Sequence, residues 1–435
     1  MFQFARRLAF GFLCFLLGAL LWGLPGRALG QGSEPATFAP EWVKAWGPGH
    51  DFPGLPANLA DLGANQAWDV FLHAGHLYVT GTDQARVRGD IDLFVRKYDL
   101  DGLLIWEEAW DNGPKDAGFV CVADADPGRV SLYVGGYTRV GNMNRALLQK
   151  RDAADGKLLW TKTWGEIPHG HHEIDGIAIH GDALYVSHYD STWAGGNINA
   201  VVRKFDKREL DRTEGKAEPA WTTVWGNRDA EQDTTDGHIF ADGTGVWVTG
   251  RIGGRSLGGG GGGDLYLTKL DPDGRQLWIK TWGGDRYDQG LSLTSDGEGL
   301  FVAGWTASRG AGAFDAAVVA FGMDGTIGPE RVWGGPSLDY SRGVAADLSH
   351  VYAAAYTKAR PTGPGRTAIL KLDKRTLDLV GEALWEGKGD DCVTTSLVQE
   401  GPWLYLAGKT NRFKDGEQTF QPVLLKVSKD FDKRR

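Results

Sequence analysis

A short apolar segment recurs seven times along this chain of 435 residues. Each copy places one aromatic residue among aliphatic neighbours, and most copies end in a small residue. The aromatic residues are 51 to 62 positions apart and lie at Tyr78, Tyr133, Tyr185, Trp247, Phe301, Tyr352 and Tyr405. Self-similarity with a period of this length is typical of propellers and solenoids. One repeat therefore fills the chain from residue 42 onward, which overrides the two or three domains that length alone would indicate.

Three further strand-like segments accompany each copy. A shorter alternating segment precedes it, as at 68–72, and a longer one follows it, as at 92–99. An Asp-x-Asp-Gly turn then leads to a segment that carries tryptophans, as at 106–110. The period of two and the Gly, Asp and Asn residues between segments predict strands joined by turns, and no stretch shows a helical period. Four antiparallel strands repeated radially form the blades of a β-propeller.

The two ends of the repeat region predict how the ring closes. The seventh copy ends at Val427 with no tryptophan segment after it, whereas 42–47 is a tryptophan segment with no blade of its own. We therefore predict an all-β fold: a seven-bladed β-propeller with four antiparallel strands per blade. The N-terminal strand should complete the last blade, which would leave no open sheet edge.

Several of these segments resemble a known family. The Trp-Gly-Gly-Asp at 282–285, the Gly-Trp-Thr at 304–306 and the Asp-Pro-Asp-Gly at 271–274 resemble the bacterial SBBP-type β-propeller repeat. The resemblance extends over all seven copies. It implies a propeller outside the cytoplasm and supplies no catalytic residues. The segment 151–160 is also similar to repeats of quinoprotein propellers, although those have Thr-Gly where this chain has Asp155-Gly156.

The first thirty residues differ from the rest. Arg6 and Arg7 precede an uncharged apolar run at 8–24, and Ala28 and Gly30 stand at the small-residue positions of a cleavage site. This pattern predicts a secretory signal peptide over residues 1–30, a short linker over 31–41 and a single propeller domain over 42–435. The alternative is a retained anchor, because seventeen apolar residues are at the lower limit for a membrane span. With the signal cleaved, we expect a secreted or periplasmic protein with no stable membrane span.

The net charge limits the class of partner, and the positions of the cysteines bear on whether a disulfide forms. Loss of residues 1–30 would remove three arginines and no acid, and would take the net charge from −9 to −12. Nucleic-acid binders are generally basic, so no nucleic-acid partner is expected. Cys121 and Cys392 are assigned to blades 2 and 7, with blade 1 between them, so no disulfide is predicted. We expect a monomer.

Residues that recur in most copies are interpreted as structural. The pair Trp-x-x-x-Trp occurs in five tryptophan segments, and both side chains of a pair face the same way on a strand. Burial of such rings between blades contributes strongly to stability, although a sugar-stacking role is an alternative. A lysine recurs in six copies, where a packed stem with a paired ammonium is expected. These residues are Lys97, Lys150, Lys204, Lys269, Lys371 and Lys426, with Ala320 in the remaining copy.

Loop lengths indicate which face of the ring is expected to bind a ligand. With strands lettered a to d outward, the a–b and c–d turns lie on one face, and the b–c and d–a connections lie on the other. The first set is predicted to be tight, except for a charged insertion at 207–219. Every b–c connection is expected to be long: 83–90, 140–145, 190–199, 252–263, 307–314, 358–365 and 411–420. Function concentrates on long loops of rigid scaffolds, so this end, called the long-loop face, is the predicted ligand-binding face.

The candidate ligand-binding residues lie on the long-loop face. Four are loop residues: Arg88, Trp193, Arg255 and Arg360. Four more are aromatic residues just after strand b, which would stack on a glycan or a peptide, or extend the packing between blades: Tyr137, Tyr189, Trp305 and Tyr356. The d–a connections of the same face carry carboxylates such as Asp116, Asp233 and Asp339, for which a solvated mixed-charge surface is the expectation.

One d–a loop is rich in histidine. It contains His169, His171 and His172, followed by Glu173. Imidazole and carboxylate groups suit zinc or copper, so a divalent metal is a hypothesis here, and no other cofactor is predicted. The alternative is a solvated loop, because structural zinc normally needs four ligands.

Three function classes remain open. The leading hypothesis is a secreted, non-catalytic propeller that binds a protein or a polysaccharide of the cell surface through its long-loop face. The first alternative is an extracytoplasmic enzyme, such as a lyase or a quinone-dependent dehydrogenase, with a site at the channel mouth. The second is a structural domain of an envelope assembly. A histidine with convergent carboxylates would favour the enzyme, and a flat apolar patch would favour protein binding.

Overall fold

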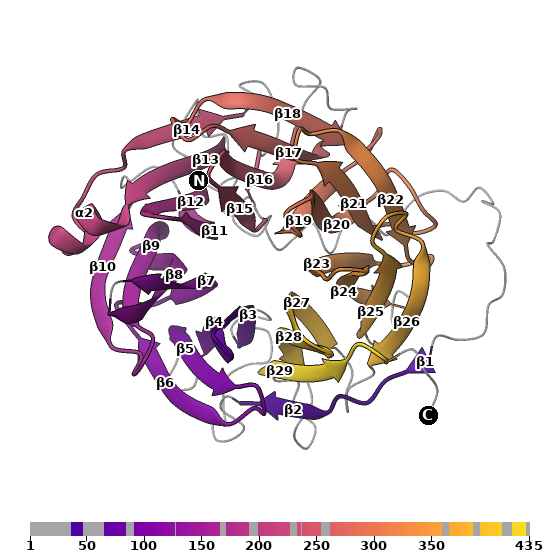
Figure 1. Ribbon diagram of the computed structural model, residues 1–435, viewed down its shortest axis with the longest axis horizontal. Helices are drawn as coiled ribbons and strands as arrows, with labels where there is room; N and C mark the ends of the chain where they lie inside the picture. The colour runs from indigo at the N-terminus through magenta and orange to yellow at the C-terminus, as the bar shows by residue number, and fades with distance from the viewer. Residues whose placement is uncertain are drawn as a thin grey trace, which may run out of the picture. The chain divides into compact units, whose positions relative to one another are not determined.

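The computed structural model of the chain describes residues 36–46, 65–83, 91–126, 128–165, 171–190, 199–226, 233–235, 237–253, 262–358, 365–385, 392–410 and 420–431. Pro35–Arg435 form one compact unit. Within this unit, seven antiparallel sheets surround a central axis (Figure 1). The predicted seven-bladed β-propeller is confirmed. No helix among these residues is long and apolar enough to cross a membrane.

The two inner strands of every blade form a hairpin that begins next to the axis. The innermost strands are β3 (Gln66–His73), β7 (Asp116–Asp126), β11 (His172–His180), β15 (Ile239–Asp242), β19 (Asp288–Ser295), β23 (Asp339–Ala346) and β27 (Cys392–Glu400). The second strands are β4 (His76–Asp83), β8 (Arg129–Val140), β12 (Ala183–Asp190), β16 (Gly245–Ile252), β20 (Gly299–Thr306), β24 (His350–Lys358) and β28 (Trp403–Thr410).

The two outer strands complete each sheet. The third strands are β5 (Asp92–Asp99), β9 (Met143–Asp152), β13 (Asn199–Asp206), β17 (Asp264–Leu270), β21 (Asp315–Gly322), β25 (Gly365–Asp373) and β29 (Gln421–Ser428). The outermost strands are β6 (Leu104–Trp110), β10 (Leu158–Trp164), β14 (Trp221–Trp225), β18 (Gln276–Trp282), β22 (Ile327–Trp333), β26 (Leu379–Trp385) and β2 (Trp42–Ala45).

The N-terminal strand closes the ring as predicted. β2 pairs antiparallel with β29 of blade 7, from Trp42 opposite Lys426 to Ala45 opposite Val423. Just before it, β1 (Ala36–Thr37) pairs in parallel with β26 of blade 6, within the segment that the sequence suggested as a linker. Phe38 packs on Phe431 in the cluster shared by blades 6 and 7. The chain start is therefore bound to two blades.

The core lies between blades. The buried apolar residues of the described chain form seven clusters, and each cluster joins two neighbouring sheets. The second tryptophan of a pair packs on the next blade: Trp46 meets Phe94 at 5.6 Å between ring centroids, and Trp225 meets Tyr266 at 6.1 Å. The expectation that these pairs pack between blades is confirmed.

The repeated lysine lies in the middle of a row that crosses each sheet. In blade 1, Tyr78 on β4, Lys97 on β5 and Trp106 on β6 are opposite one another. The ammonium of Lys97 lies 5.4 Å from the centre of the Tyr78 ring. The Lys97 Nζ and the Trp106 Nε1 both donate to the Ala153 carbonyl of blade 2, at 2.9 and 3.2 Å. This row connects blade 1 to the c–d turn of blade 2.

The same connection recurs in blade 3, whereas Lys269 of blade 4 donates to Thr244 of its own blade at 2.9 Å. In blade 3, Lys204 Nζ and Trp221 Nε1 both donate to the Pro272 carbonyl of blade 4, at 2.8 and 2.9 Å. The glycine of that turn, Gly274, has φ +84° and lies so close to Trp221 that a Cβ would come within 2.6 Å of the ring. The Asp-x-Asp-Gly turn therefore needs glycine both for its left-handed backbone and for the ring beneath it. We call this lysine–tryptophan–turn contact the rim connection.

Two local expectations were wrong. The b–c connection of blade 2 is not long, because β8 continues to Val140 and β9 begins at Met143. This leaves a two-residue turn with Gly141 at φ +61°. The chain also contains a helix, α2 (Lys207–Arg212), inside the charged insertion of blade 3. Asp206 caps it by accepting from the Glu209 amide, and Leu210 is fully buried, so one cap and one apolar anchor suffice.

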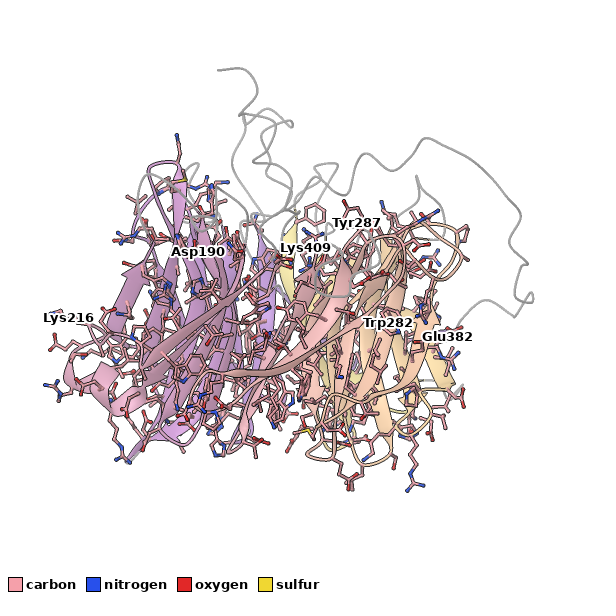
Figure 2. All side chains as sticks on the ribbon, turned by 90° about the horizontal axis from the view of Figure 1, so that it is seen from above. Asp190, Lys216, Trp282, Tyr287, Glu382 and Lys409 are labelled. Carbon is pink, nitrogen blue, oxygen red and sulfur yellow. The ribbon has the colours of Figure 1, made fainter. Side chains whose placement is uncertain are left out.

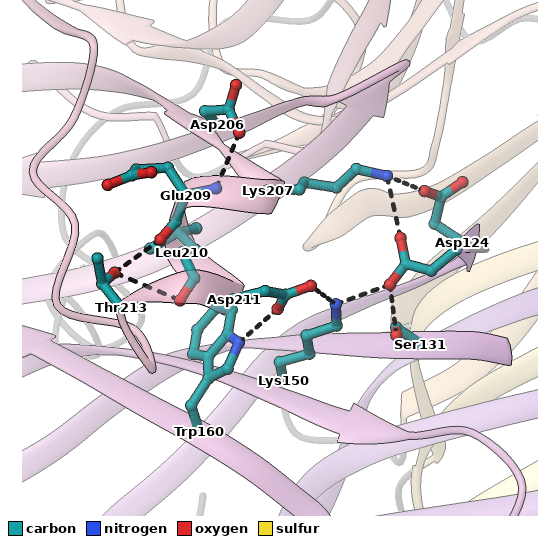
Figure 3. Close-up of polar contacts among 11 residues, drawn as sticks. Asp124, Ser131, Lys150, Trp160, Asp206, Lys207, Glu209, Leu210, Asp211 and Thr213 are labelled. Atoms are coloured by element: carbon teal, nitrogen blue, oxygen red, sulfur yellow. Dashed lines mark hydrogen bonds and ion pairs between the residues drawn. The ribbon is translucent and has the colours of Figure 1, made fainter. Parts of the chain in front are cut away.

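The insertion takes over the rim connection of blade 2 (Figure 3). Asp211 of α2 accepts from Lys150 Nζ at 2.6 Å and from Trp160 Nε1 at 2.9 Å, in place of a turn carbonyl. Lys150 is fully buried and also pairs with Asp126 at 2.7 Å. Lys207 contacts Asp124 and Asp126. The insertion is therefore fixed to blade 2 by charged groups.

Candidate functional site

The innermost strands carry a β-bulge at the same place in six of the seven blades. One residue of the strand has no partner on the neighbouring strand, and it lies two or three positions from the strand's start at the long-loop face. A bulge re-aims the side chains around it. The extra residues are Trp68, Phe119, Asp175, Leu291, Arg342 and Thr395.

The position after the bulge differs from blade to blade. It holds Asp69, Val120, Gly176, Ser292, Gly343 and Ser396. In blade 4, His238 directly precedes β15, whose first residue Ile239 pairs with Val248, so His238 takes the equivalent place. Strands, rim and core repeat around the ring, whereas this position carries an acid, an imidazole and two hydroxyls.

Four of these side chains meet across the axis. His238 of blade 4 approaches Asp69 of blade 1, on the far side of the ring, with 3.6 Å between Nε2 and Oδ1. Ser292 of blade 5 lies 3.4 Å from Nδ1 of the same imidazole. Ser396 of blade 7 donates to Asp69 Oδ1 at 2.7 Å, and the Cys121 amide of blade 2 donates to Oδ2 at 2.9 Å. We call Asp69, His238, Ser292 and Ser396 the axial cluster.

The side chains of the axial cluster differ in how far they are exposed to solvent. The Asp69 side chain is 5% exposed and His238 is 29% exposed, so the imidazole is the accessible member. Burial, with a smaller effect of Asp69, raises the pKa of the Cys121 thiol well above its ordinary value, which makes that thiol unreactive. The carboxylate is held by two donors and lies 3.6 Å from the imidazole Nε2, which is within ion-pair range but longer than a hydrogen bond.

The axial cluster contains the residue types of a hydrolytic triad, but its serine is not accessible to a substrate. A hydroxyl, an imidazole and a carboxylate are in series, which is the order that activates a serine nucleophile. Ser292, however, is 1% exposed, and a nucleophile has to reach its substrate. The arrangement therefore suits hydrogen bonding to a ligand or proton transfer through His238 better than attack by Ser292.

An aromatic wall adjoins the axial cluster in blades 1 and 2. Trp68 packs edge-on against Phe119, with 5.0 Å between ring centroids, and Phe119 packs against Tyr137 at 5.5 Å. All three rings are partly exposed. The Trp68 Nε1 is buried and meets no acceptor in the described part of the chain. The wall offers apolar surface beside the polar cluster, as many ligand sites do.

The predicted aromatic residues lie inside strand b. Tyr137 belongs to the aromatic wall, and Tyr189 lies opposite Glu173 on β11. Trp305 packs against Phe314 at 4.4 Å between centroids. Tyr356 is buried, and its ring stacks on that of Tyr340 at 4.9 Å. The structure thus brings only Tyr137 next to the axial cluster. Arg88, Trp193, Arg255 and Arg360 lie outside the described residues.

The predicted metal residues are partly described. His171 Nδ1 accepts from the Asn144 amide at 3.3 Å, and burial, followed by Arg139 and His172, lowers its pKa. His172 is buried, with its Nδ1 3.7 Å from Asp190. His169 lies outside the described residues. Among the residues that are described, no three His, Cys, Asp or Glu side chains gather in a metal-binding group.

Three of the d–a carboxylates are not solvated, contrary to expectation. Asp116, Asp233 and Asp339 are fully buried. Each accepts from a backbone amide of its own connection or a neighbouring one, as Asp339 does from Gly335 at 2.8 Å and Asp233 from Gly253 at 2.7 Å. Burial raises the pKa of Asp116 and of Asp339 to about 6. These side chains organise the connections of the long-loop face.

The axial cluster escaped the search of the sequence because no local motif marks it. Asp69 and Ser292 lie within segments that read only as repeated strands. When the seven innermost strands are aligned, the column that contains Asp69 and Ser292 holds Asp, Val, Gly, His, Ser, Gly and Ser in chain order. That column is the signal that could have found the cluster, because residues dispersed one per blade meet only at the axis.

Comparison with known proteins supports the fold alone. No family model matches the chain, and no curated protein matches it. A puromycin hydrolase structure superposes with a TM-score of 0.50 at 13% identity, over 92% of this chain and 56% of that one. A Mycobacterium tuberculosis puromycin-hydrolyzing peptidase gives 0.46 at 14% identity, over 86% and 53%. Chaetomium thermophilum Sqt1, bound to the N-terminus of a ribosomal protein, gives 0.47 at 12% identity, over 85% and 98%. The chain spans about half the length of the two hydrolases.

Proposed function

We propose that this protein is a secreted or periplasmic binding propeller of the SBBP-repeat type. It takes a protein or a cell-surface polymer at the axial end of its long-loop face and carries out no reaction on it. The N-terminal pattern of residues 1–30 supports export. The observation that carries the proposal is the axial position itself, which repeats in backbone and varies in chemistry from blade to blade.

The geometry supports recognition in two ways. The axial cluster offers a partly exposed imidazole, with Asp69 and Ser292 beside it, as a hydrogen-bonding group. The aromatic wall offers partly exposed rings, and the Trp68 Nε1 has no acceptor among the described residues. Orienting polar groups beside apolar surface, on a rigid scaffold, are the usual parts of a recognition site.

Affinity capture tests this proposal. Immobilised protein is incubated with a cell-envelope extract of the source organism, and the retained material is compared among wild type, Trp68→Ala, His238→Ala and Arg208→Ala. Arg208 is a matched control because it is 79% exposed on α2, away from the long-loop face. We expect capture to fall at least tenfold in the first two variants and to persist in the third. Loss of capture only in Arg208→Ala would contradict the proposal.

An enzymatic function is favoured by one observation. The axial cluster joins a histidine to a carboxylate across the axis, which is the pairing that proton abstraction by a lyase requires. Under this alternative, His238→Gln would abolish turnover of the captured ligand while leaving its binding within about threefold. Unchanged ligand after prolonged incubation with wild type would count against the alternative.

A further inference from the structure

A polar pocket, separate from the axial cluster, lies on the long-loop face at the junction of blades 4 and 5. Its volume is about 320 Å³, and it lies between the b–c loop of blade 5 and the turn before β19. The side chains that line it are those of Asp285, Arg286, Ser308 and Arg309, and the rest of its lining is Ala307 and the small residues 310–312. Figure 2 shows Tyr287, next to the pocket in sequence, at the same end of the ring as Asp190 and Lys409, which lie near the ends of strands β12 and β28.

Hydrogen bonds hold this pocket in shape. Ser308 Oγ donates to Asp288 at 2.7 Å and accepts from the Arg286 amide at 3.0 Å, which joins the loop to the turn. The Ala307 amide donates to the Tyr287 carbonyl at 2.8 Å, and the Gly312 amide donates to Asp315 at 2.9 Å. A ligand would therefore not have to order the loop on binding, which is a large part of the cost of association.

The two arginines of the pocket differ in whether their side chains are paired with other side chains. The Arg309 guanidinium lies over the Trp282 ring, 4.7 Å from its centre, and bonds to Glu330. The Arg286 side chain is exposed and pairs with no side chain in the described part of the chain. A guanidinium presents two parallel N–H donors that match a carboxylate, so Arg286 is a ready anion partner.

The rest of the lining favours a sugar polymer over a peptide. Protein partners are held chiefly by aromatic and apolar anchors in dry central pockets, and this pocket offers small residues and polar groups instead. Tyr287 is 39% exposed beside it, under the guanidinium of Arg251 at 5.6 Å, and presents a flat ring. Asp285 adds a carboxylate, which would accept hydrogen bonds from sugar hydroxyls.

We propose that this pocket binds a carboxylate-bearing polysaccharide, with Arg286 pairing with the carboxylate and Asp285 accepting from a hydroxyl. The inference rests on the proposed function, since it names the ligand class of the long-loop face. The net charge of the chain is −9, so general retention of polyanions is not expected, and retention would report these local groups.

The probe is immobilised polygalacturonate, with neutral dextran and poly-glutamate as comparison surfaces. Binding of the full chain is measured by biolayer interferometry at low salt and at 0.3 M salt. We expect wild type to bind polygalacturonate and not dextran, and Arg286→Ala to weaken that binding at least fivefold. Arg208→Ala, the matched control because this arginine is exposed on the opposite side, should stay within twofold of wild type.

The other outcomes are decisive. Absence of wild-type binding to polygalacturonate, or equal binding of Arg286→Ala, overturns the pocket assignment. Preferential binding to poly-glutamate overturns the polysaccharide class in favour of an acidic peptide. Binding that is lost in His238→Ala and kept in Arg286→Ala overturns the pocket and leaves the axial site of the proposed function standing. Loss of envelope capture in Trp68→Ala with intact polygalacturonate binding supports both sites separately.

Discussion

The rim and the axis of this propeller follow opposite rules. At the rim, the same residues make the same contact in blades 1 and 3, where Lys97 with Trp106 and Lys204 with Trp221 donate to a carbonyl of the next blade. At the axis, one position of the innermost strand carries five different residue types in the seven blades. Symmetric residues hold the ring together, and the position where symmetry fails is where distinct chemical groups are brought together.

Blade 5 shows that the rim contact matters more than the residues that make it. It has Ala320 in place of the lysine, and the rim connection is made from the outermost strand instead. Arg331 Nε donates to the Leu377 carbonyl of blade 6 at 2.9 Å, and Trp333 Nε1 donates to Glu382 at 2.6 Å. A different set of residues thus links the blade to its neighbour.

Opening the ring is expected to have the largest effect. Deletion of residues 36–46 removes β1 and β2, exposes the edge of β29, and takes Trp42, Trp46 and Phe38 out of the core. Loss of each of the two buried rings, Phe38 and Trp46, costs about 3–5 kcal/mol, and loss of the partly buried Trp42 adds to this, so the total approaches the stability of a typical domain. We expect loss of cooperative unfolding, measured by circular dichroism during urea titration. A deletion variant that keeps a wild-type midpoint would show that closure does not support the rim.

Breaking one rim connection should have the next largest effect. Lys150→Ala leaves the carboxylates of Asp126 and Asp211 near each other without their shared ammonium. Loss of one partner from a buried ion pair typically costs about 3–5 kcal/mol. We expect a loss of about 3 kcal/mol in the free energy of unfolding, from urea titration. Lys216→Ala, on the exposed part of the insertion, is the control and should change it by less than about 0.5 kcal/mol.

The rim and the fold were predictable from the sequence because they repeat. Seven copies of one strand pattern, with tryptophan and lysine in fixed columns, indicate the blade number, and the unmatched strand at 42–47 indicates the closure. The sequence predicted a packed lysine stem with its ammonium in an ion pair, as Lys150 and Lys426 have, but not the turn carbonyl that Lys97 reaches at Ala153, more than fifty residues away. The short helix α2 escaped because a single cap and one buried leucine give no helical period.

The candidate site was less predictable for a physical reason. Asp69, His238, Ser292 and Ser396 are separated by up to 327 positions, and only the closed ring brings them together. Loop length indicated the end of the ring where the pocket beside Arg286 lies, whereas the axial groups come from the strands. The tight turn at Gly141 shows the limit of loop counting, because the strands of blade 2 extend into residues that were counted as loop.

The pH dependence of stability tests the role of the buried carboxylates on the long-loop face. Burial raises the pKa of Asp116 and of Asp339 to about 6, above the ordinary aspartate value of 3.8. The folded protein therefore binds protons more tightly than the unfolded chain, so this contribution to stability is complete below about pH 4 and is lost as the pH rises through 6. Asp116→Asn and Asp339→Asn should be more stable than wild type at pH 7.5, on the order of 2 kcal/mol each, and close to it at pH 4.5.

Asp347→Asn is the matched control of opposite sign. Burial acts to raise the pKa of Asp347, but hydrogen bonds from Lys429 and from the backbone bring it down to about 2. It stays ionised from pH 4.5 to 7.5, so its removal should lower stability by the same amount across that window. Urea titrations at three pH values distinguish the two patterns. A constant difference for Asp116→Asn would show that its carboxyl titrates normally.

The smallest effect on stability is expected at the axis. His238→Ala removes a side chain that is 29% exposed, with its nearest partners at 3.4 and 3.6 Å, so little well-formed hydrogen bonding is lost. Asp69 keeps its bonds to Ser396 and to the Cys121 amide and is not left unpaired. We therefore expect His238→Ala to lower the free energy of unfolding by less than about 1 kcal/mol, compared with about 3 kcal/mol for Lys150→Ala. Capture of envelope material should show the reverse order, with a strong loss in His238→Ala and little change in Lys150→Ala below its unfolding midpoint. If His238→Ala instead destabilises the fold as much as Lys150→Ala and leaves capture intact, the axial cluster is a brace across the ring, and the division of labour between rim and axis is wrong.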